Sequence, residues 1–127
     1  MQSRRVPRRE WSQFFDDFSR RHRGSATTVR VFGPRIGSQV EARDMPLEGI
    51  VSSGDPTGPL SIHLGSAPPR SNLEHEIEEP RQVWVGLSEG GAEKALEIRS
   101  EDGTQTVIEF RSAPARGGRR GSGRKET

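Results

Sequence analysis

The stretch EKALEIRSEDGTQTVIEFR, residues 93–111, decides the fold that this sequence predicts. Apolar side chains alternate with polar ones on both sides of the tetrapeptide Ser-Glu-Asp-Gly at residues 100–103. Period-two alternation around a glycine-containing turn is typical of a β-hairpin. Gly103 can adopt the left-handed backbone conformation that closes such a turn, and the turn then sets which side chains face inward.

A second periodicity precedes the hairpin and predicts an α-helix. Its apolar residues recur at i, i+3, i+4 and i+7 and are all aromatic: Trp11, Phe14, Phe15 and Phe18. Pro7 suits the first helical position and Gly24 suits the residue just beyond the last turn. We expect the aromatic stripe to dock on a sheet, because a small monomer tolerates poorly the exposed rings of a stacking platform or a partner groove.

Between helix and hairpin, the chain alternates short apolar runs with loops rich in glycine and proline. We predict strands at residues 27–32, 45–52, 60–64 and 83–87, with Gly49 at a bulge or bend. Residues 36–43 are extended or helical, and residues 73–79 are a helical turn or an edge segment. The predicted fold is α+β: one N-terminal amphipathic helix on a curled antiparallel sheet or small open barrel of about six strands.

The strand pattern also leaves apolar residues on the face opposite the inward set. There are four of them: Phe32, Ile50, Trp84 and Val107. Exposed apolar patches of this kind need a cover in a monomer. We therefore expect the aromatic stripe of the helix to contact some of these four side chains.

Charge and composition divide the chain into a body and two basic ends. The net charge of +2 combines +4 in residues 1–9, +4 in residues 112–127 and −6 between them. Residues 112–127 contain no hydrophobic residue larger than alanine, so they cannot offset the entropy of ordering. We predict a disordered N-terminus (1–6), a single α+β domain (7–111) and a disordered Arg/Gly-rich tail (112–127).

The residue types and segments that the sequence lacks exclude several classes of function. The chain has no cysteine, so disulfides, thiolate metal sites and cysteine nucleophiles are excluded. No apolar run follows the basic N-terminus as in a secretory signal, and none is long enough to span a bilayer. A cytoplasmic protein with no membrane partner is expected.

The body resembles a family of small bacterial proteins catalogued as a domain of unknown function. Residues 73–111 carry much of the resemblance: a proline before a strand, Leu-Glu-Ile, Asp-Gly-Thr, and a strand ending in Phe-Arg. The aromatic start of the helix and Pro-Leu-Glu-Gly-Ile at residues 46–50 are also similar, so the resemblance covers residues 10–111. The family implies no known activity, cofactor or catalytic residue. Its members often carry a histidine near the short segment that precedes the proline, and His75 lies there in this chain.

His75 is the strongest metal candidate, because acids surround it in the run LEHEIEE at residues 73–79. The spacing is not H-E-x-x-H, and no second histidine is near in sequence. We therefore expect a solvated acidic segment and no metal site, unless the fold brings His63 within ligand distance. No nucleophile elbow or phosphate-binding loop is present, so we assign no catalytic residue and no cofactor.

The C-terminal basic tail is the best functional feature of the sequence. The C-terminal end resembles arginine–glycine segments that bind RNA or single strands, but it lacks aromatic residues for stacking, so any binding would be electrostatic. The candidate nucleic-acid-binding residues are Arg4, Arg5, Arg8, Arg9, Arg116, Arg119, Arg120, Arg124 and Lys125. Alternatively, the tail has no ligand and only solubilises, or it docks on the protein's own acidic strip at residues 74–79.

Three functional hypotheses follow, in this order. The first is a small, β-rich, non-enzymatic domain that acts through contacts with an unknown protein partner or with itself. The second is weak, sequence-independent binding of RNA or DNA through the basic ends. The third is a metal-assisted or acid/base enzyme.

Overall fold

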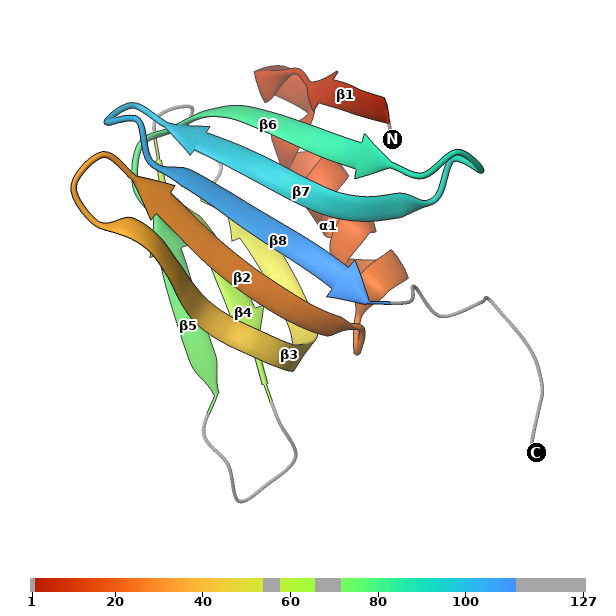
Figure 1. Ribbon diagram of the computed structural model, residues 1–127. Coiled ribbons are helices and arrows are strands. Elements are labelled where there is room, and N and C mark those ends of the chain that lie inside the picture. The colour runs from red at the N-terminus through yellow and green to blue at the C-terminus, as the bar shows by residue number, and fades with distance from the viewer. Residues whose placement is uncertain (1, 54–57, 66–71, 112–127) are drawn as a thin grey trace.

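The computed structural model describes residues 2–53, 58–65 and 72–111 as one helix and a strongly bent sheet (Figure 1). The elements in chain order are β1 (Gln2–Val6), a short 3-10 helix η1 (Arg8–Glu10), α1 (Trp11–His22), β2 (Ala26–Gly33), β3 (Gly37–Ser52), β4 (Leu60–Leu64), β5 (Leu73–Ile77), β6 (Pro80–Leu87), β7 (Glu93–Ser100) and β8 (Gln105–Arg111). No helix in this described part is long and apolar enough to cross a membrane.

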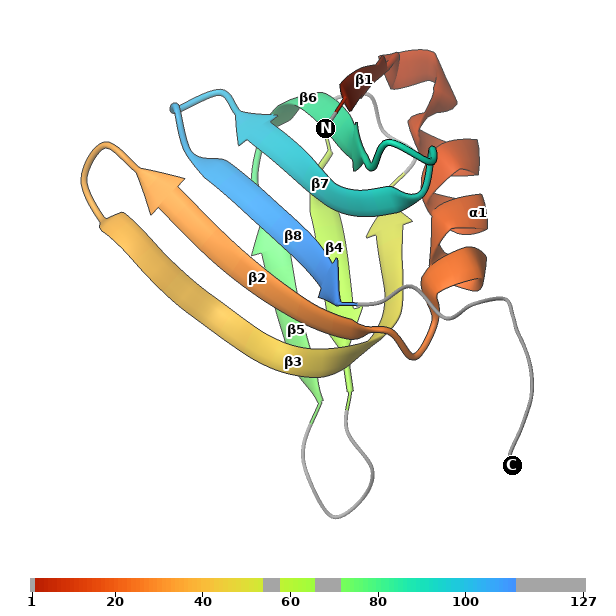
Figure 2. The same ribbon diagram turned by 45° about the vertical axis from the view of Figure 1, so that its right-hand side comes forward.

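The eight strands form one antiparallel sheet in the order β1-β6-β7-β8-β2-β3-β4-β5. Strand β3 passes from one layer to the other: its first part pairs with β2 and its last part with β4. Strands β4 and β5 therefore lie behind β2 and β8, and α1 lies beside the last part of β3 (Figures 1 and 2). The sheet does not close, since β1 and β5 remain its two outer strands.

Irregular pairing bends β3. The register with β2 shifts on both sides of Val29, and Asp44 adopts a positive φ of 53° while its N–H donates to the Thr28 hydroxyl at 3.2 Å. A second shift separates Leu47 from Gly49 opposite β4, which confirms the predicted bulge. Bulges increase local twist, so β3 turns the corner between the layers.

The core lies between the two layers and the helix. Alternate residues of the strands point into it, and the helix adds three rings that are fully or almost fully buried: Trp11, Phe15 and Phe18. The ring of Phe18 lies 5.1 Å from that of Phe110 on β8. Each such side chain contributes about 1.5–3 kcal/mol through burial, so the stripe is a main source of stability.

Hydrogen bonds fasten α1 to the edge of β3. The Ser19 hydroxyl accepts the N–H of Ile50 at 2.8 Å and donates to the carbonyl of Ile50 at 3.3 Å. Just beyond the helix, the Gly24 N–H donates to the Leu47 carbonyl, and the Leu47 N–H donates to the Ser25 carbonyl. Within the described residues, no strand pairs with β3 on this side, so the helix and the residues that follow it form hydrogen bonds with the main-chain groups of Ile50 and Leu47 instead.

The predicted hairpin and helix are confirmed. Strands β7 and β8 pair in continuous register, and Gly103 has a φ of +91° in the turn between them. The regular helix begins at Trp11, after the 3-10 turn, and Gly24 has the predicted left-handed conformation.

The strand count and the N-terminus require correction. Residues 2–6, predicted to be disordered, form β1, because they pair with β6 over five residues and bury Val6 to 1% exposure. Residues 36–43 prove extended and mostly belong to β3, and residues 73–77 form the outer strand β5. The sheet therefore has eight strands rather than about six. The predicted tail, 112–127, lies outside the described residues.

The helix covers the inward face of the sheet, not the opposite one. Trp84 and Val107 each lie between buried neighbours and point the other way, and Phe32 is 36% exposed. Only Ile50 joins the helix in the core, because the shift near Gly49 rotates it inward. The helix was expected to contact some of these four residues, and only Ile50 lies with its rings in the core; the idea that the helix covers the opposite face is wrong. Arg99, rather than the helix, lies over the ring of Trp84, at 5.6 Å.

Replacing Ser19 with alanine should destabilise the fold by about 1–3 kcal/mol, since the substitution strips the buried N–H and carbonyl of Ile50 of their partner. Chemical denaturation measures this loss. Ser12→Ala on the exposed side of the same helix is the matched control and should change stability little. Equal effects of the two substitutions would contradict the fastening role.

Candidate functional site

The structure separates the four N-terminal candidate arginines into two kinds. Arg4 and Arg5 are exposed on β1 and point to opposite faces, since they pair with Val85 and Trp84, and the Arg4 guanidinium lies 6.0 Å from the Phe14 ring. Arg8 has a structural role: its guanidinium donates to the Pro80 carbonyl at 3.1 Å and lies 4.5 Å from the Trp11 ring. Arg9 is exposed on η1. The five C-terminal candidates, Arg116, Arg119, Arg120, Arg124 and Lys125, lie outside the described residues.

Strand register separates the residues of the candidate metal site. His75 pairs with Ile62, whose side chain is fully buried, whereas His63 pairs with Glu74 and shares the outward face. The two histidines therefore point to opposite sides of the sheet, and His75 points away from its acidic neighbours. Within the described ranges, no group of three histidine, aspartate or glutamate side chains could hold a metal ion.

The acidic strip forms an outer edge of the sheet. Its exposed carboxylates are those of Glu74, Glu76, Glu78 and Glu79. A hydrogen bond to Glu78, together with the charge of that residue, raises the pKa of Glu76 above its ordinary value. The carboxylates of Glu76 and Glu78 therefore repel one another, and a cationic partner would relieve that repulsion.

Exposed apolar side chains gather at the turn between β2 and β3. Three of the four large exposed apolar residues of the described chain lie on this hairpin tip, residues 32–40: Phe32 at 36%, Ile36 at 47% and Val40 at 41% exposure. Figures 1 and 2 show the tip projecting from one end of the sheet. It borders an open hollow of about 490 Å³, which Gly103 and Gln105 of the β7–β8 hairpin also line. The sequence alone could not show this gathering, since Phe32 was expected to be covered.

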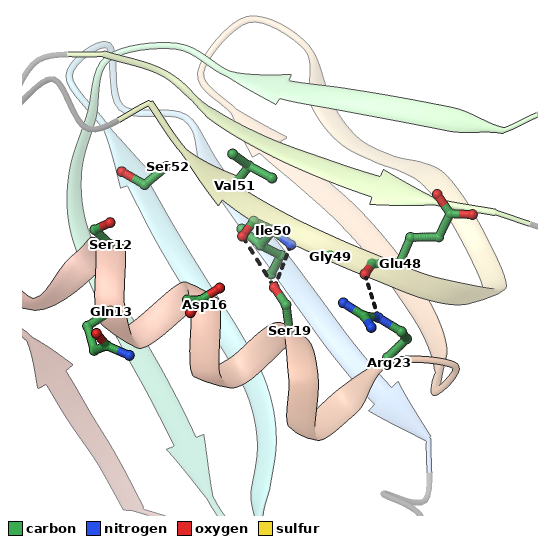
Figure 3. A pocket seen from close by; sticks show the side chains of 10 residues that line it. All are labelled: Ser12, Gln13, Asp16, Ser19, Arg23, Glu48, Gly49, Ile50, Val51 and Ser52. Carbon is green, nitrogen blue, oxygen red and sulfur yellow. Dashed lines mark hydrogen bonds between the residues drawn. The ribbon is translucent and has the colours of Figure 1, made fainter.

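A groove of about 350 Å³ runs between α1 and β3 (Figure 3). Its polar groups hold the helix to the strand: Ser19 bonds Ile50, and the Arg23 guanidinium donates to the Glu48 carbonyl at 3.4 Å. Asp16 at the rim forms an ion pair with Arg20. The groove is therefore the junction between the helix and the sheet, and its central polar groups are already hydrogen-bonded to each other.

A buried histidine lies at the C-terminal end of the helix. His22 is 5% exposed, stacks on Phe110 at 5.0 Å, and places Nε2 2.6 Å from the carboxylate of Glu93. Arg21 donates two hydrogen bonds to the same carboxylate, at 3.2 and 2.8 Å. The other ring nitrogen, Nδ1, is buried without a hydrogen-bond partner. The cluster holds α1 against β7. Since His22 and Glu93 are 71 residues apart in the sequence, no local pattern could predict their contact.

The fold and these surfaces define a small α+β domain whose distinctive exposed features are an apolar hairpin tip and charged sheet edges. The model of the family of unknown function DUF5335 matches residues 2–117, so the chain belongs to that family. This confirms the resemblance drawn from the sequence. An uncharacterized protein from Aquifex aeolicus (strain VF5) is 26% identical over 114 residues, which cover 89% of this chain and 96% of that protein. No solved structure matches the chain.

The carboxylate of Glu93 should make stability depend on pH. Burial alone would raise the pKa of Glu93, but hydrogen bonds from His22 and Arg21 and the positive charge of Arg21 outweigh it and lower that pKa. A carboxylate with a depressed pKa stabilises the fold above its unfolded pKa, and this stabilisation is lost as pH falls through the folded pKa. Glu93→Gln should therefore cost about 1.5–3 kcal/mol near pH 7 and progressively less in acid.

Denaturation curves of the wild type and the variant between pH 7 and pH 3 measure this difference. The exposed Glu89 provides the control substitution Glu89→Gln, which should leave stability nearly unchanged across that range. A Glu93→Gln difference that stays constant with pH would rule out the ionised clamp.

Proposed function

We propose that this domain is a cytoplasmic, non-enzymatic association module whose docking surface is the hairpin tip. The observation that carries the proposal is the gathering of three large exposed apolar side chains on one projecting turn. Scattered apolar residues on a surface are ordinary, but a contiguous group is typical of protein contact sites.

The backbone of the tip also suits a protein partner. Strand β3 pairs with β2 across residues 37–40, and no strand of the described chain pairs with β3 on its other side there. A partner chain can therefore contact apolar side chains and main-chain groups at the same place. Farther along, the bulges near Asp44 distort β3, so the pairing surface is confined to the tip.

The two polar clusters, around His22 and in the α1–β3 groove, support a binding function rather than a catalytic one. The ring of His22 is packed between Phe18 and Phe110, where a substrate has no access to it. The polar groups at the centre of the α1–β3 groove already bond to one another. Both clusters thus serve the fold, whereas the side chains of the hairpin tip serve no packing role of comparable extent.

Site-specific photo-crosslinking in the producing cells tests this function. A photo-reactive amino acid replaces Ile36 or Val40 on the hairpin tip, and Val51 as the matched control, since Val51 is equally apolar and 53% exposed elsewhere. We expect discrete crosslinked species at positions 36 and 40, containing either a second copy of the chain or one partner protein. The yield at position 51 should be much lower.

Equal yields at the three positions, or no discrete species at positions 36 and 40, would show that the hairpin tip is ordinary surface. An added variant keeps the test clear of folding effects. Ile36→Lys should preserve thermal stability, because the side chain is not part of the core, and should abolish the crosslinks from position 40.

A second candidate function is weak, sequence-independent nucleic-acid binding through the basic ends. The observation that favours it is the exposure of Arg4, Arg5 and Arg9 on adjoining elements, within a segment, residues 1–9, that contains no acid. Phosphate contacts of this kind release counterions, so the binding constant falls steeply with salt.

Filter binding of single-stranded RNA in rising salt measures that dependence. Replacing Arg4, Arg5 and Arg9 with glutamine should weaken binding and reduce the slope of log K against log salt by about 2, at ~0.7 per phosphate contact. The same substitution at Arg8 would confound the result, since Arg8 holds the fold. Absence of RNA retention by the wild type at low salt would eliminate this candidate.

A further inference from the structure

The two outer strands of the sheet match each other in length and regularity. Strands β1 and β5 each contain five residues and lie at opposite ends of the strand order. Each pairs with its one neighbour, β6 or β4, without a register shift. Regular outer strands of this kind present main-chain N–H and carbonyl groups on which another strand can form.

The two edges carry opposite charges. Strand β1 exposes Arg4 and Arg5, and η1 adds Arg9. Strand β5 exposes Glu74 and Glu76, and two further exposed glutamates, Glu78 and Glu79, follow it. Like charges on both edges would prevent copies of a sheet from joining edge to edge. Opposite charges make each edge repel its own kind and attract the other.

We infer that copies of this chain associate head to tail, with the β1 edge of one copy added as a strand to the β5 edge of the next. Arg5 pairs with Trp84 and thus faces outward on β1, and Glu74 and Glu76 face outward on β5. Continuation of the sheet would place these charges side by side. The contact joins two different surfaces, so it generates rings or open chains rather than a two-fold dimer.

This association uses neither residue 36 nor residue 40, so it stands independently of the hairpin tip. Its ion pairs are exposed to solvent, and salt screens such pairs over about 10 Å at 0.1 M. The association should therefore be weak and confined to low ionic strength. An increase from 50 to 500 mM salt should weaken it by about tenfold or more.

Charge reversal tests the inference. The double variant R4E/R5E carries two acidic edges, and E74R/E76R carries two basic edges. Sedimentation velocity at low salt follows each tag-free, nuclease-treated chain across a concentration series. The wild type should form oligomers, each variant alone should remain monomeric, and an equimolar mixture of the two variants should associate again.

The restored association of the mixture distinguishes the edge contact from simple misfolding. Circular dichroism and thermal midpoints of each variant provide the folding control. A monomeric wild type at low salt, or a mixture of folded variants that stays monomeric, would overturn the inference.

Other occupants of the acidic edge give different results. If glutamine at Arg119, Arg120 and Arg124 abolishes assembly while R4E/R5E retains it, the C-terminal segment binds the acidic edge and the inference is wrong. If Ile36→Lys with Val40→Lys abolishes assembly, the hairpin tip is the contact instead. If that hairpin variant retains salt-sensitive assembly, the edge contact is supported, and this result does not depend on whether the hairpin tip is a docking surface.

Discussion

The edge of β3 that faces the helix is the constraint on which the rest of the structure depends. Because β3 leaves one layer for the other, its last part has a strand partner on one side only. Its polar groups would lie buried and unpaired without Ser19 and the main chain around Gly24. Once the helix is fastened there, its rings fill the open side of the bent sheet, and β1 and β5 remain as outer strands.

Local patterns predicted those elements that short-range chemistry determines. The β7–β8 hairpin follows from alternation and Gly103, and α1 follows from its aromatic stripe and Gly24. The missed elements depend on partners far along the chain. Strand β1 exists because β6 lies beside it, with paired residues 77 or more positions apart, and the corner in β3 depends on the Thr28 hydroxyl. No local pattern in residues 2–6 or 41–44 encodes those partners.

The candidate surfaces were predictable in composition but not in position. The basic run near Arg4 and the acidic run near Glu76 are evident in the sequence, yet only strand pairing shows that they occupy the two outer edges of one sheet. Register likewise places His63 and His75 on opposite faces. Phe32 is exposed at the hairpin tip because the helix covers the inward face of the sheet, and the strand pattern alone does not tell which face the helix covers.

Fastening of α1 to β3 thus links the fold to its surfaces, because it directs the hydrophobic face inward and leaves the hairpin tip and both charged edges outside. Hydrogen exchange of the Ile50 amide tests this claim most directly, since its N–H donates to Ser19 rather than to a strand. The structure predicts exchange as slow as that of the Ile98 amide in the centre of the sheet. Exchange of Ile50 as fast as that of a frayed, solvent-exposed edge amide would contradict the account.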